Sequence, residues 1–206
     1  MGDDFVPTHR RVACVSTLLV GFVVALSLFT GSGVVGTAQA AEAPECSAVS
    51  CEGSGTSGDP FEVSTLDQLQ CIGQTPDGSN SDGEYYELQN DIDASETATW
   101  NNGAGFEPLS GGLSFSGTID GNGFVISNLS IDRPDERYVG LVGFFSDTSR
   151  DNVSLEGIHL ESVDITGSEN VGGVVGNNRG TVSNASVSGR VTATSGSSVG
   201  GVVGSG

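Results

Sequence analysis

The chain has 206 residues, enough for one ordinary domain or one stack of repeats. Its formal net charge is −19, from 26 acidic residues against seven arginines and no lysine. Such a charge repels phosphate backbones and argues against nucleic-acid binding. It also opposes a compact fold until molar salt shortens the Debye length to about 3 Å. The composition therefore indicates a protein adapted to a salty milieu, from a halophilic source.

The first 40 residues have the layout of a secretory signal peptide. Arg10-Arg11 precedes an apolar run from Val12 to Phe29, and Ala38-Gln39-Ala40 matches a small-x-small cleavage site. We expect residues 1–40 to insert in the membrane only during export, by the Sec or the twin-arginine route, and then to be removed. A retained membrane anchor is the alternative, because a run of 18 apolar or small residues can just span a bilayer.

Cysteine usage fits an exported protein. Cys14 lies in the leader, which leaves Cys46, Cys51 and Cys71. Export permits one disulfide among these three, and we expect it to tie the N-terminal tail to the first helix. A metal site is disfavoured, because the thiols lack the paired spacing of zinc sites and His159 lies far along the chain. We predict no cofactor.

A cap is expected ahead of the repeats. After a tail over residues 41–63, Ser64 or Thr65 would cap a short helix whose apolar side consists of Leu66, Leu69 and Ile72. The open end of a repeat stack exposes unpaired strand edges, so a terminal cover is needed there. We therefore assign residues 64–125 to a helix-containing cap and the first turns of the stack.

A valine–glycine hexad recurs in the second half of the chain. It reads VGLVGF from Val139 and VGGVVG from both Val171 and Val199, at spacings of 32 and 28 residues. Glycines at such a corner let neighbouring backbones pack closely. We predict that residues 126–206 form stacked repeats with these three valines in one column of the core.

A second phrase of six residues recurs between the hexads. Its first, fourth and sixth places are apolar in Ile126–Ile131, Leu155–Leu160 and Val182–Val187. The first and fourth places are three residues apart, whereas the fourth and sixth are two apart. A continuous strand would keep its apolar residues at even spacing, so the strand must be interrupted between the first and fourth places. The third place, which lies in that interval, holds Asn128, Gly157 and Asn184. Asn and Gly tolerate positive φ best, so these three are predicted bends. The predicted interior residues after the bends are Leu129, Ile131, Ile158, Leu160, Ala185 and Val187.

These patterns predict an all-β fold, a right-handed parallel β-helix with a short N-terminal capping helix. Each period would hold about three short strands, the third at residues 163–165 and 191–193. The alternative is a β-sandwich of short antiparallel strands. That fold would not need matching hexads, and the tight hairpin signals that it favours are sparse here.

The ordered phrases resemble the GLUG-repeat β-helix proteins. The residues that carry the resemblance are GSGTSGDPFEVSTLDQLQCIG (53–73), YYELQNDIDAS (85–95), FSGTIDGNGFVISNLSI (115–131) and the hexads. That family occurs on the surface of, or is secreted by, bacteria and haloarchaea. The resemblance implies a haloarchaeal secreted or cell-surface module, adhesin-like and without enzymatic activity. Because the chain stops at Gly206 within a hexad-bearing repeat, without a C-terminal cap or anchor, we expect a fragment of a longer product.

Parallel β-helices also include polysaccharide lyases and glycosidases, so a carbohydrate-active enzyme is the rival function. Glycosidic hydrolysis needs two carboxylates about 5–9.5 Å apart across a groove. The candidates are Asp91 with Asp93, Asp132 with Asp135, and Asp164 with carboxylates one or two turns of the stack away. In so acidic a chain we interpret nearly all of them as solvated surface. Lyase chemistry needs cations to steady an enolate, whereas lysine is absent and the arginines are expected singly in loops. We predict that the chain is not an enzyme.

Two short segments offer oxygen ligands. Asp120-Gly-Asn-Gly123 and Asn90-Asp-Ile-Asp93 could bind a structural calcium ion, although neither has the spacing of a known calcium loop. The first is better interpreted as a tight turn between strands.

The aromatic residues and His159 also have two interpretations each. Tyr85, Tyr86 and Trp100 could form a sugar-stacking platform, and packing under the cap is the favoured interpretation. His159 matches Ser130 and Ser186 in the phrase alignment, so we predict an ordinary exposed histidine.

Three N-glycosylation sequons begin at Asn128, Asn152 and Asn184. Asn152 lies in the longest loop and is the predicted acceptor. The side chains of the two bend asparagines are expected to turn inward and satisfy backbone groups, which competes with a glycan. The partner is predicted to be an extracellular or cell-surface protein or glycan, of unknown identity.

Overall fold

The computed structural model describes residues 41–74, 83–109, 114–146, 153–196 and 198–206. The chain divides into two units, Met1–Gln39 and Ala40–Gly206, and the fold described below belongs to the second. The predicted leader over residues 1–40 and the predicted glycan acceptor Asn152 lie outside the described residues. None of the helical segments in the described ranges has the length and apolar character that crossing a bilayer requires.

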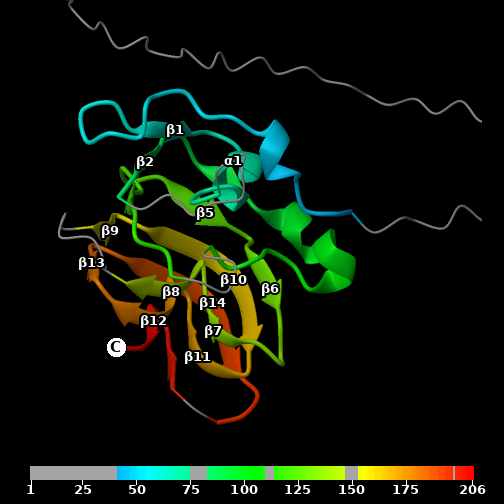
Figure 1. The fold of residues 1–206 in the computed structure, drawn as a ribbon. Helices are drawn as coiled ribbons and strands as arrows, with labels where there is room; N and C mark the ends of the chain where they lie inside the picture. Colours follow the sequence, from blue (N-terminus) through cyan, green and yellow to red (C-terminus); the bar gives the residue numbers. More distant parts are fainter. Residues whose placement is uncertain (1–40, 75–82, 110–113, 147–152, 197) are drawn as a thin grey trace, which may run out of the picture. The chain divides into compact units, whose positions relative to one another are not determined.

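Strands far apart in the sequence lie side by side in four parallel sheets (Figure 1). The first sheet contains, in spatial order, β1 (Phe61–Val63), β2 (Tyr85–Leu88), β4 (Thr118–Asp120), β9 (Ser154–Glu156) and β13 (Thr181–Ser183). The second contains β3 (Ile92–Asp93), β5 (Val125–Ser127), β10 (His159–Gly167) and β14 (Ser186–Ala193), with β6 (Ser130–Asp132) beside β10.

The two smaller sheets are built from the hexads. One contains β7 (Arg137–Val139), β11 (Glu169–Gly172) and β15 (Val199–Gly200). The other contains β8 (Val142–Ser146), β12 (Val175–Arg179) and β16 (Val203–Ser205). From β4 onward the chain visits the four sheets in the same order in each repeat, so strands of successive repeats become neighbours.

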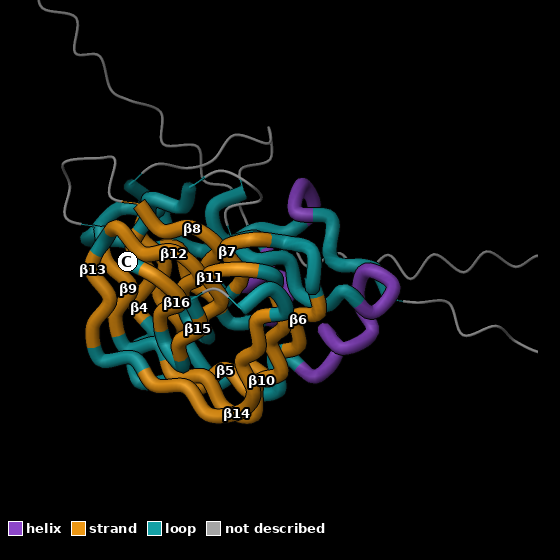
Figure 2. The backbone as a smooth tube through the Cα atoms, turned by 90° about the horizontal axis from the view of Figure 1, so that it is seen from below, coloured by secondary structure: helices purple, strands orange, loops and turns teal. Residues whose placement is uncertain are grey.

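All pairings between the named strands are parallel. Within the described residues this excludes the β-sandwich of antiparallel strands. Figure 2 shows the strands wound around a common interior, with the helical segments to one side. The all-β prediction is confirmed at this level.

The hexads stand in register, as their identical sequences require. Val171 pairs with Val139 on one side and with Val199 on the other. Val139 and Val171 are fully buried, whereas Val199 is 49% exposed. Its placement in the core is therefore wrong: β15 lies at the edge of its sheet, and no described strand pairs with its outer side.

The predicted alignment of the six-residue phrases is wrong in one of its three members. Leu155 is in register with Val182, as expected, but its other neighbour is Ile119. Ile126 instead matches Leu160.

The phrase at Ile126 is misaligned because each repeat has two different corners with the same sequence pattern. At both corners a residue with positive φ lies between two short strands. Gly157 (φ 63°) and Asn184 (φ 48°) follow β9 and β13, whereas Asn128 (φ 59°) follows β5. All three are bends, as predicted, but they occupy two corners.

The expected third strand of each repeat is not separate. Residues 163–165 and 191–193 continue β10 and β14 beyond an irregularity in register between Leu160 and Val163. Ile165 then pairs with Ile131 and Val191, which forms another apolar column.

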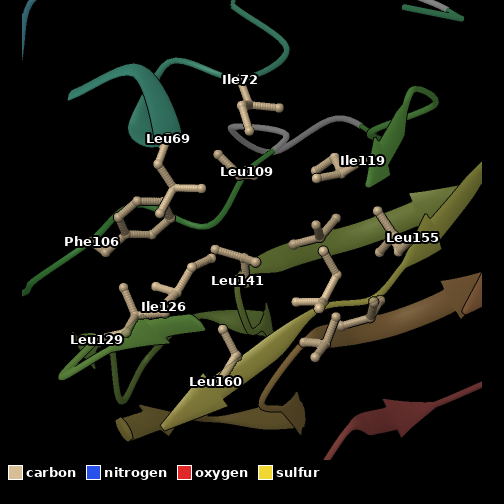
Figure 3. Close-up of a cluster of buried hydrophobic side chains, with 14 of the residues drawn as sticks. Leu69, Ile72, Phe106, Leu109, Ile119, Ile126, Leu129, Leu141, Leu155 and Leu160 are labelled. Carbon is tan, nitrogen blue, oxygen red and sulfur yellow. The ribbon is translucent and has the colours of Figure 1, made fainter. Parts of the chain in front are cut away.

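The core is continuous from the cap through the repeats. In Figure 3, Leu69 and Ile72 near the cap face the same cluster as Leu109, Leu141 and Leu155. The predicted interior residues Leu129, Ile131, Ile158 and Leu160 are at most 1% exposed. In the last repeat, Ala185 and Val187 are only partly buried.

The cap begins with a capping box. Thr65 accepts a hydrogen bond from the Gln68 backbone N–H at 3.2 Å, and the Gln68 side chain accepts one from the Thr65 N–H at 3.1 Å. The helix α1 (Leu66–Gln70) follows. Buried Gln70 both donates to and accepts from the Glu107 backbone, at 2.9 Å each, which fixes the helix to the following segment.

One disulfide ties the N-terminal tail to the cap. It joins Cys46, in the short 3-10 segment η1 (Cys46–Ala48), to Cys71 just after α1. Cys51 remains a thiol. The tail over residues 41–63 ends in β1, which pairs with β2 and so starts the first sheet.

Candidate functional site

The carboxylates near β3 hold turns together. Asp91 Oδ1 accepts a hydrogen bond from the Val125 N–H at 2.9 Å. Asp93 Oδ1 accepts from the Ser95 N–H at 3.0 Å and from Asn128 Nδ2 at 2.9 Å. The Asn128 amide, followed by the Ser95 N–H, lowers the pKa of Asp93 below its ordinary value, because both donors stabilise the ionised form. Both aspartates thus make hydrogen bonds that stabilise turns.

Two of the other candidate carboxylates, Asp132 and Asp164, are diagonal neighbours on the paired strands β6 and β10. Asp132 is in register with Thr166, and Asp164 with Ser130 and Arg190. Asp132, Asp135 and Asp164 are exposed. In the described part of the chain, no three His, Cys, Asp or Glu side chains are grouped so that they could hold a metal ion.

The two segments considered for calcium use their oxygens within turns. Asp120 Oδ1 accepts from the Asn122 N–H at 2.8 Å, and the Phe124 N–H donates to Gly121 O at 2.8 Å. This is a tight turn between β4 and β5, with positive φ at Asn122 and Gly123. In the other segment, Asn90 Nδ2 donates to backbone oxygens of Ser64 and Asp91.

A column of carboxylates crosses the first sheet. Glu62, Glu87, Asp120 and Glu156 are in register on β1, β2, β4 and β9. Neighbouring strands are about 4.8 Å apart, so like charges repel along this column. Asn122 Nδ2 donates to Glu87 Oε1 at 2.8 Å. The column follows from strand register, which the sequence alone did not reveal.

Two of the three aromatic residues near the cap are buried. Tyr86 and Trp100 are 6% and 3% exposed. Tyr86 Oη accepts from the Gly73 N–H at 3.1 Å and donates to Glu84 Oε2 at 2.6 Å. Tyr86 also packs in a row of rings with Phe61 at 5.5 Å and Phe115 at 6.4 Å between centroids. Packing under the cap is thus the correct interpretation for Tyr86 and Trp100, whereas Tyr85 is partly exposed.

His159 joins two repeats. Its Nδ1 lies 2.8 Å from Ser186 Oγ, and these two residues are in register on β10 and β14. The second neighbour in register is Val125, not Ser130 as the phrase alignment had it.

The side chains of the two described sequon asparagines do not turn inward, contrary to expectation. Asn128 and Asn184 are both exposed. The positive φ at each bend directs the side chain outward, and Asn128 Nδ2 donates to Asp93 in the preceding repeat. The expectation that Asn152 is the preferred acceptor stays a prediction.

Sequence reasoning missed a cluster of two arginines and two rings on β7, β8 and β12. We call it the arginine–aromatic cluster: Arg137, Tyr138, Phe144 and Arg179. The Tyr138 and Phe144 rings are stacked, 5.8 Å apart at 30°. The guanidinium of Arg137 lies 5.3 Å from the centre of the Tyr138 ring, and that of Arg179 lies 5.3 Å from the centre of the Phe144 ring.

The backbone around this cluster depends on a hexad glycine. Tyr138 has φ 60°, a region that bulky residues rarely occupy. A Cβ on Gly176 would lie 2.5 Å from the Tyr138 carbonyl carbon, so only glycine allows this close approach. Gly176 of the hexad therefore helps to determine the backbone position of Tyr138, although the arginine–aromatic cluster lies outside the core.

The expectation that arginines sit singly in loops is wrong. Arg137, Arg179 and Arg190 lie on β7, β12 and β14. A signal was available in the sequence: Phe144 and Phe145 are adjacent, so a strand must point one of the two rings outward. Phe145 is fully buried and Phe144 is the outward one.

Comparisons with known proteins find two relatives. The chain is 39% identical over 177 residues, 84% of its length, to halomucin of Haloquadratum walsbyi, of which this covers 2%. It is 32% identical over 145 residues, 68% of its length, to a protein of Evansella cellulosilytica described as a Gly-rich membrane protein, of which this covers 16%. The chain thus spans only a small part of either relative.

No family model matches the chain. Among solved structures, one from Bacteroides ovatus, described as an immunoglobulin A1 protease, is 16% identical with a TM-score of 0.37. The similarity covers 74% of this chain and 63% of that one. A score this low carries no argument about fold or function.

Proposed function

We propose that this chain is a non-enzymatic module of a secreted or cell-surface haloarchaeal protein. Its fold is a right-handed parallel β-helix of GLUG-repeat type. Its role is to act as a scaffold whose outer faces make adhesin-like contacts with extracellular proteins or glycans. The single observation that carries this proposal is the return of the chain to the same four parallel sheets, in the same order, in each repeat. Such stacks present extended surfaces without a deep pocket.

The relatives support the surface location. Halomucin comes from Haloquadratum walsbyi, and the second relative is described as a membrane protein. The net charge of −19 without lysine agrees with a protein that works in concentrated salt. The predicted leader agrees with export.

The rival function, a carbohydrate-active enzyme, is less well supported. Asp91 and Asp93 accept backbone and amide hydrogen bonds that hold turns. Asp132 and Asp164 lie on the same exposed face of neighbouring strands, and Asp135 is exposed as well. A glycosidase would instead need two carboxylates that face one bond from opposite sides.

The location is tested by protease treatment of intact haloarchaeal cells that express the tagged full-length chain. We expect the tag to be lost from the cells or found in the medium, while a cytoplasmic marker is preserved. A tag that stays protected inside intact cells contradicts the proposal.

The activity is tested with the purified chain and a panel of polysaccharides in molar salt. We expect sedimentation with at least one polysaccharide or cell-envelope fraction, without new reducing ends or unsaturated products. Product formed above the level of a heat-denatured control would show an enzyme.

A further inference from the structure

Of the three exposed arginines that the structure describes, two lie together on one face. Of the arginines that the structure describes, Arg133 is committed to internal bonds: its Nε donates to Phe106 O, its Nη1 pairs with Glu136, and its side chain is 13% exposed. Arg190 lies on β14, in register with Asp164 on β10. The remaining two, Arg137 and Arg179, both belong to the arginine–aromatic cluster. A polyanion would meet the least repulsion there.

The cluster holds its guanidinium groups in place. Each lies 5.3 Å from the centre of a ring, and the two rings stack on each other at 5.8 Å. A guanidinium held against an aromatic face loses less freedom when it binds a ligand. Arg137 uses Nε for Glu169 at 2.8 Å and is 59% exposed, which leaves its outer nitrogens toward solvent. Neither ion pair of the described residues uses Arg179.

Neighbouring groups supply hydrogen bonds. Asn177 is in register with Phe144 on the same outer face, and its Nδ2 donates to Ser205 Oγ at 2.9 Å. Tyr138 is partly exposed, and its ring, which bears a phenol group, lies 5.3 Å from the Arg137 guanidinium. Its φ of 60° is a strained conformation, of the kind that persists where the position of a side chain matters.

We propose that the arginine–aromatic cluster is a binding site for an acidic saccharide, a short chain that bears uronic-acid carboxylates. Guanidinium groups bind carboxylates through two parallel hydrogen bonds, and phenol and amide groups suit sugar hydroxyls. Two arginines are too few for a nucleic acid, whose affinity grows with the number of phosphates neutralised. The inference rests on the proposed contact function. It names the class of ligand and locates the binding site at the arginine–aromatic cluster.

The test is calorimetric titration of the full 206-residue chain with trigalacturonic acid. In about 1 M NaCl the Debye length is about 3 Å, so the distant acids of the protein are screened while direct contacts remain. We expect binding, and we expect Arg179→Gln and Arg137→Gln each to weaken it about tenfold, the effect of losing one charge-assisted hydrogen bond. Arg179→Lys should weaken it as well, because lysine lacks the planar fork.

Arg190→Gln is the matched control, since it removes an exposed arginine that lies on another sheet. It should bind like the wild type, and circular dichroism should show all variants folded. The neutral probe xylotriose should bind at least tenfold more weakly.

Four outcomes overturn parts of this proposal separately. Absence of wild-type binding contradicts the acidic-saccharide ligand. Equal loss in Arg190→Gln and Arg179→Gln contradicts the site and leaves the contact function standing. Tighter arginine-dependent binding of a single-stranded oligonucleotide would show that the ligand class is wrong. Shortened trigalacturonic acid in mass spectrometry would contradict the proposed non-enzymatic function.

Discussion

Asp93 joins two repeats through one carboxylate oxygen, which accepts from Ser95 in its own repeat and from Asn128 in the next. These donors favour the ionised form, so the folded-state pKa lies below the ordinary value. A depressed pKa adds stability at pH values above the unfolded pKa of about 3.9, and the gain is lost as the pH falls through the lower folded value.

We therefore expect Asp93→Asn to be less stable than the wild type at neutral pH. The gap should begin to narrow as the pH falls below about 3.9, and it should close only below the lower folded pKa, where the folded wild-type carboxyl also becomes neutral. Urea unfolding across that range measures the gap. A difference that stays constant down to the lowest pH would contradict this role of Asp93.

The two described sequons differ at the amide nitrogen that would carry a glycan. Asn128 Nδ2 donates to Asp93, and a sugar there would break that bond between repeats. Asn184 is exposed at the equivalent kind of bend, and among the described residues no side-chain hydrogen bond engages it. We expect Asn184 to be more fully occupied than Asn128 when the chain is made in a glycosylating haloarchaeal host. Glycopeptide mass spectrometry that finds only Asn128 modified would refute this order.

At the scale of the elements, the hexad glycines set the distance between repeats. A Cβ on Gly173 would lie 2.4 Å from Gly201 O and 2.7 Å from the Val187 methyl groups. The equivalent Gly201 in the next hexad has open space at the Cβ position.

Gly173→Ala should therefore lower the free energy of unfolding by about 1–3 kcal/mol through overpacking. Gly201→Ala, the matched control, should be neutral or stabilise by up to about 1 kcal/mol through the unfolded state. Chemical denaturation compares the two variants. Equal losses would mean that the hexads do not pack as described.

Added salt should screen the repulsion between carboxylates most directly in the carboxylate column. Glu156 stands in register with Asp120, whereas Glu161, also exposed, stands in register with Ser127. We expect Glu156→Gln to stabilise the chain by about 0.2–1 kcal/mol in low salt, and the gain to fade in molar salt. Glu161→Gln should give a smaller gain. Unfolding curves at two salt concentrations measure both variants, and a gain that is independent of salt would argue against repulsion along the column.

For the whole molecule, the net charge of −19 should make folding depend on salt. We expect the β-signal in circular dichroism to grow as NaCl or KCl is added, because the mutual repulsion of the acidic side chains is then screened. A chain that is equally folded in dilute buffer would count against a halophilic adaptation.

The sequence predicted those features in which identical residues must lie above one another. The register of Val139 with Val171 follows from the repeated hexad. The turn from Asp120 to Gly123 and a short helix capped by Ser64 or Thr65 follow from local patterns, and the structure assigns the cap to Thr65. The phrase at Ile126 was placed against the wrong neighbours, because two corners of the repeat obey the same local rule.

The arginine–aromatic cluster was missed for a different reason. Its members come from three strands, and Tyr138 adopts a backbone conformation that its residue type disfavours. Local propensity cannot foresee a conformation that is imposed by the close approach of Gly176 in the next repeat. Contacts of this kind become visible only when the strand register is known.

The order of the sheets also bears on how the protein is made. Each strand pairs with strands of the neighbouring repeats, so no described sheet needs a later repeat before an earlier pair of strands can form. A polypeptide that is synthesised N-terminus first can therefore assemble progressively, with the disulfide-linked cap as its template. Each new strand can then pair with the unpaired edge strand of the repeats that have already folded. This pairing shortens the time during which apolar strands are exposed and can aggregate.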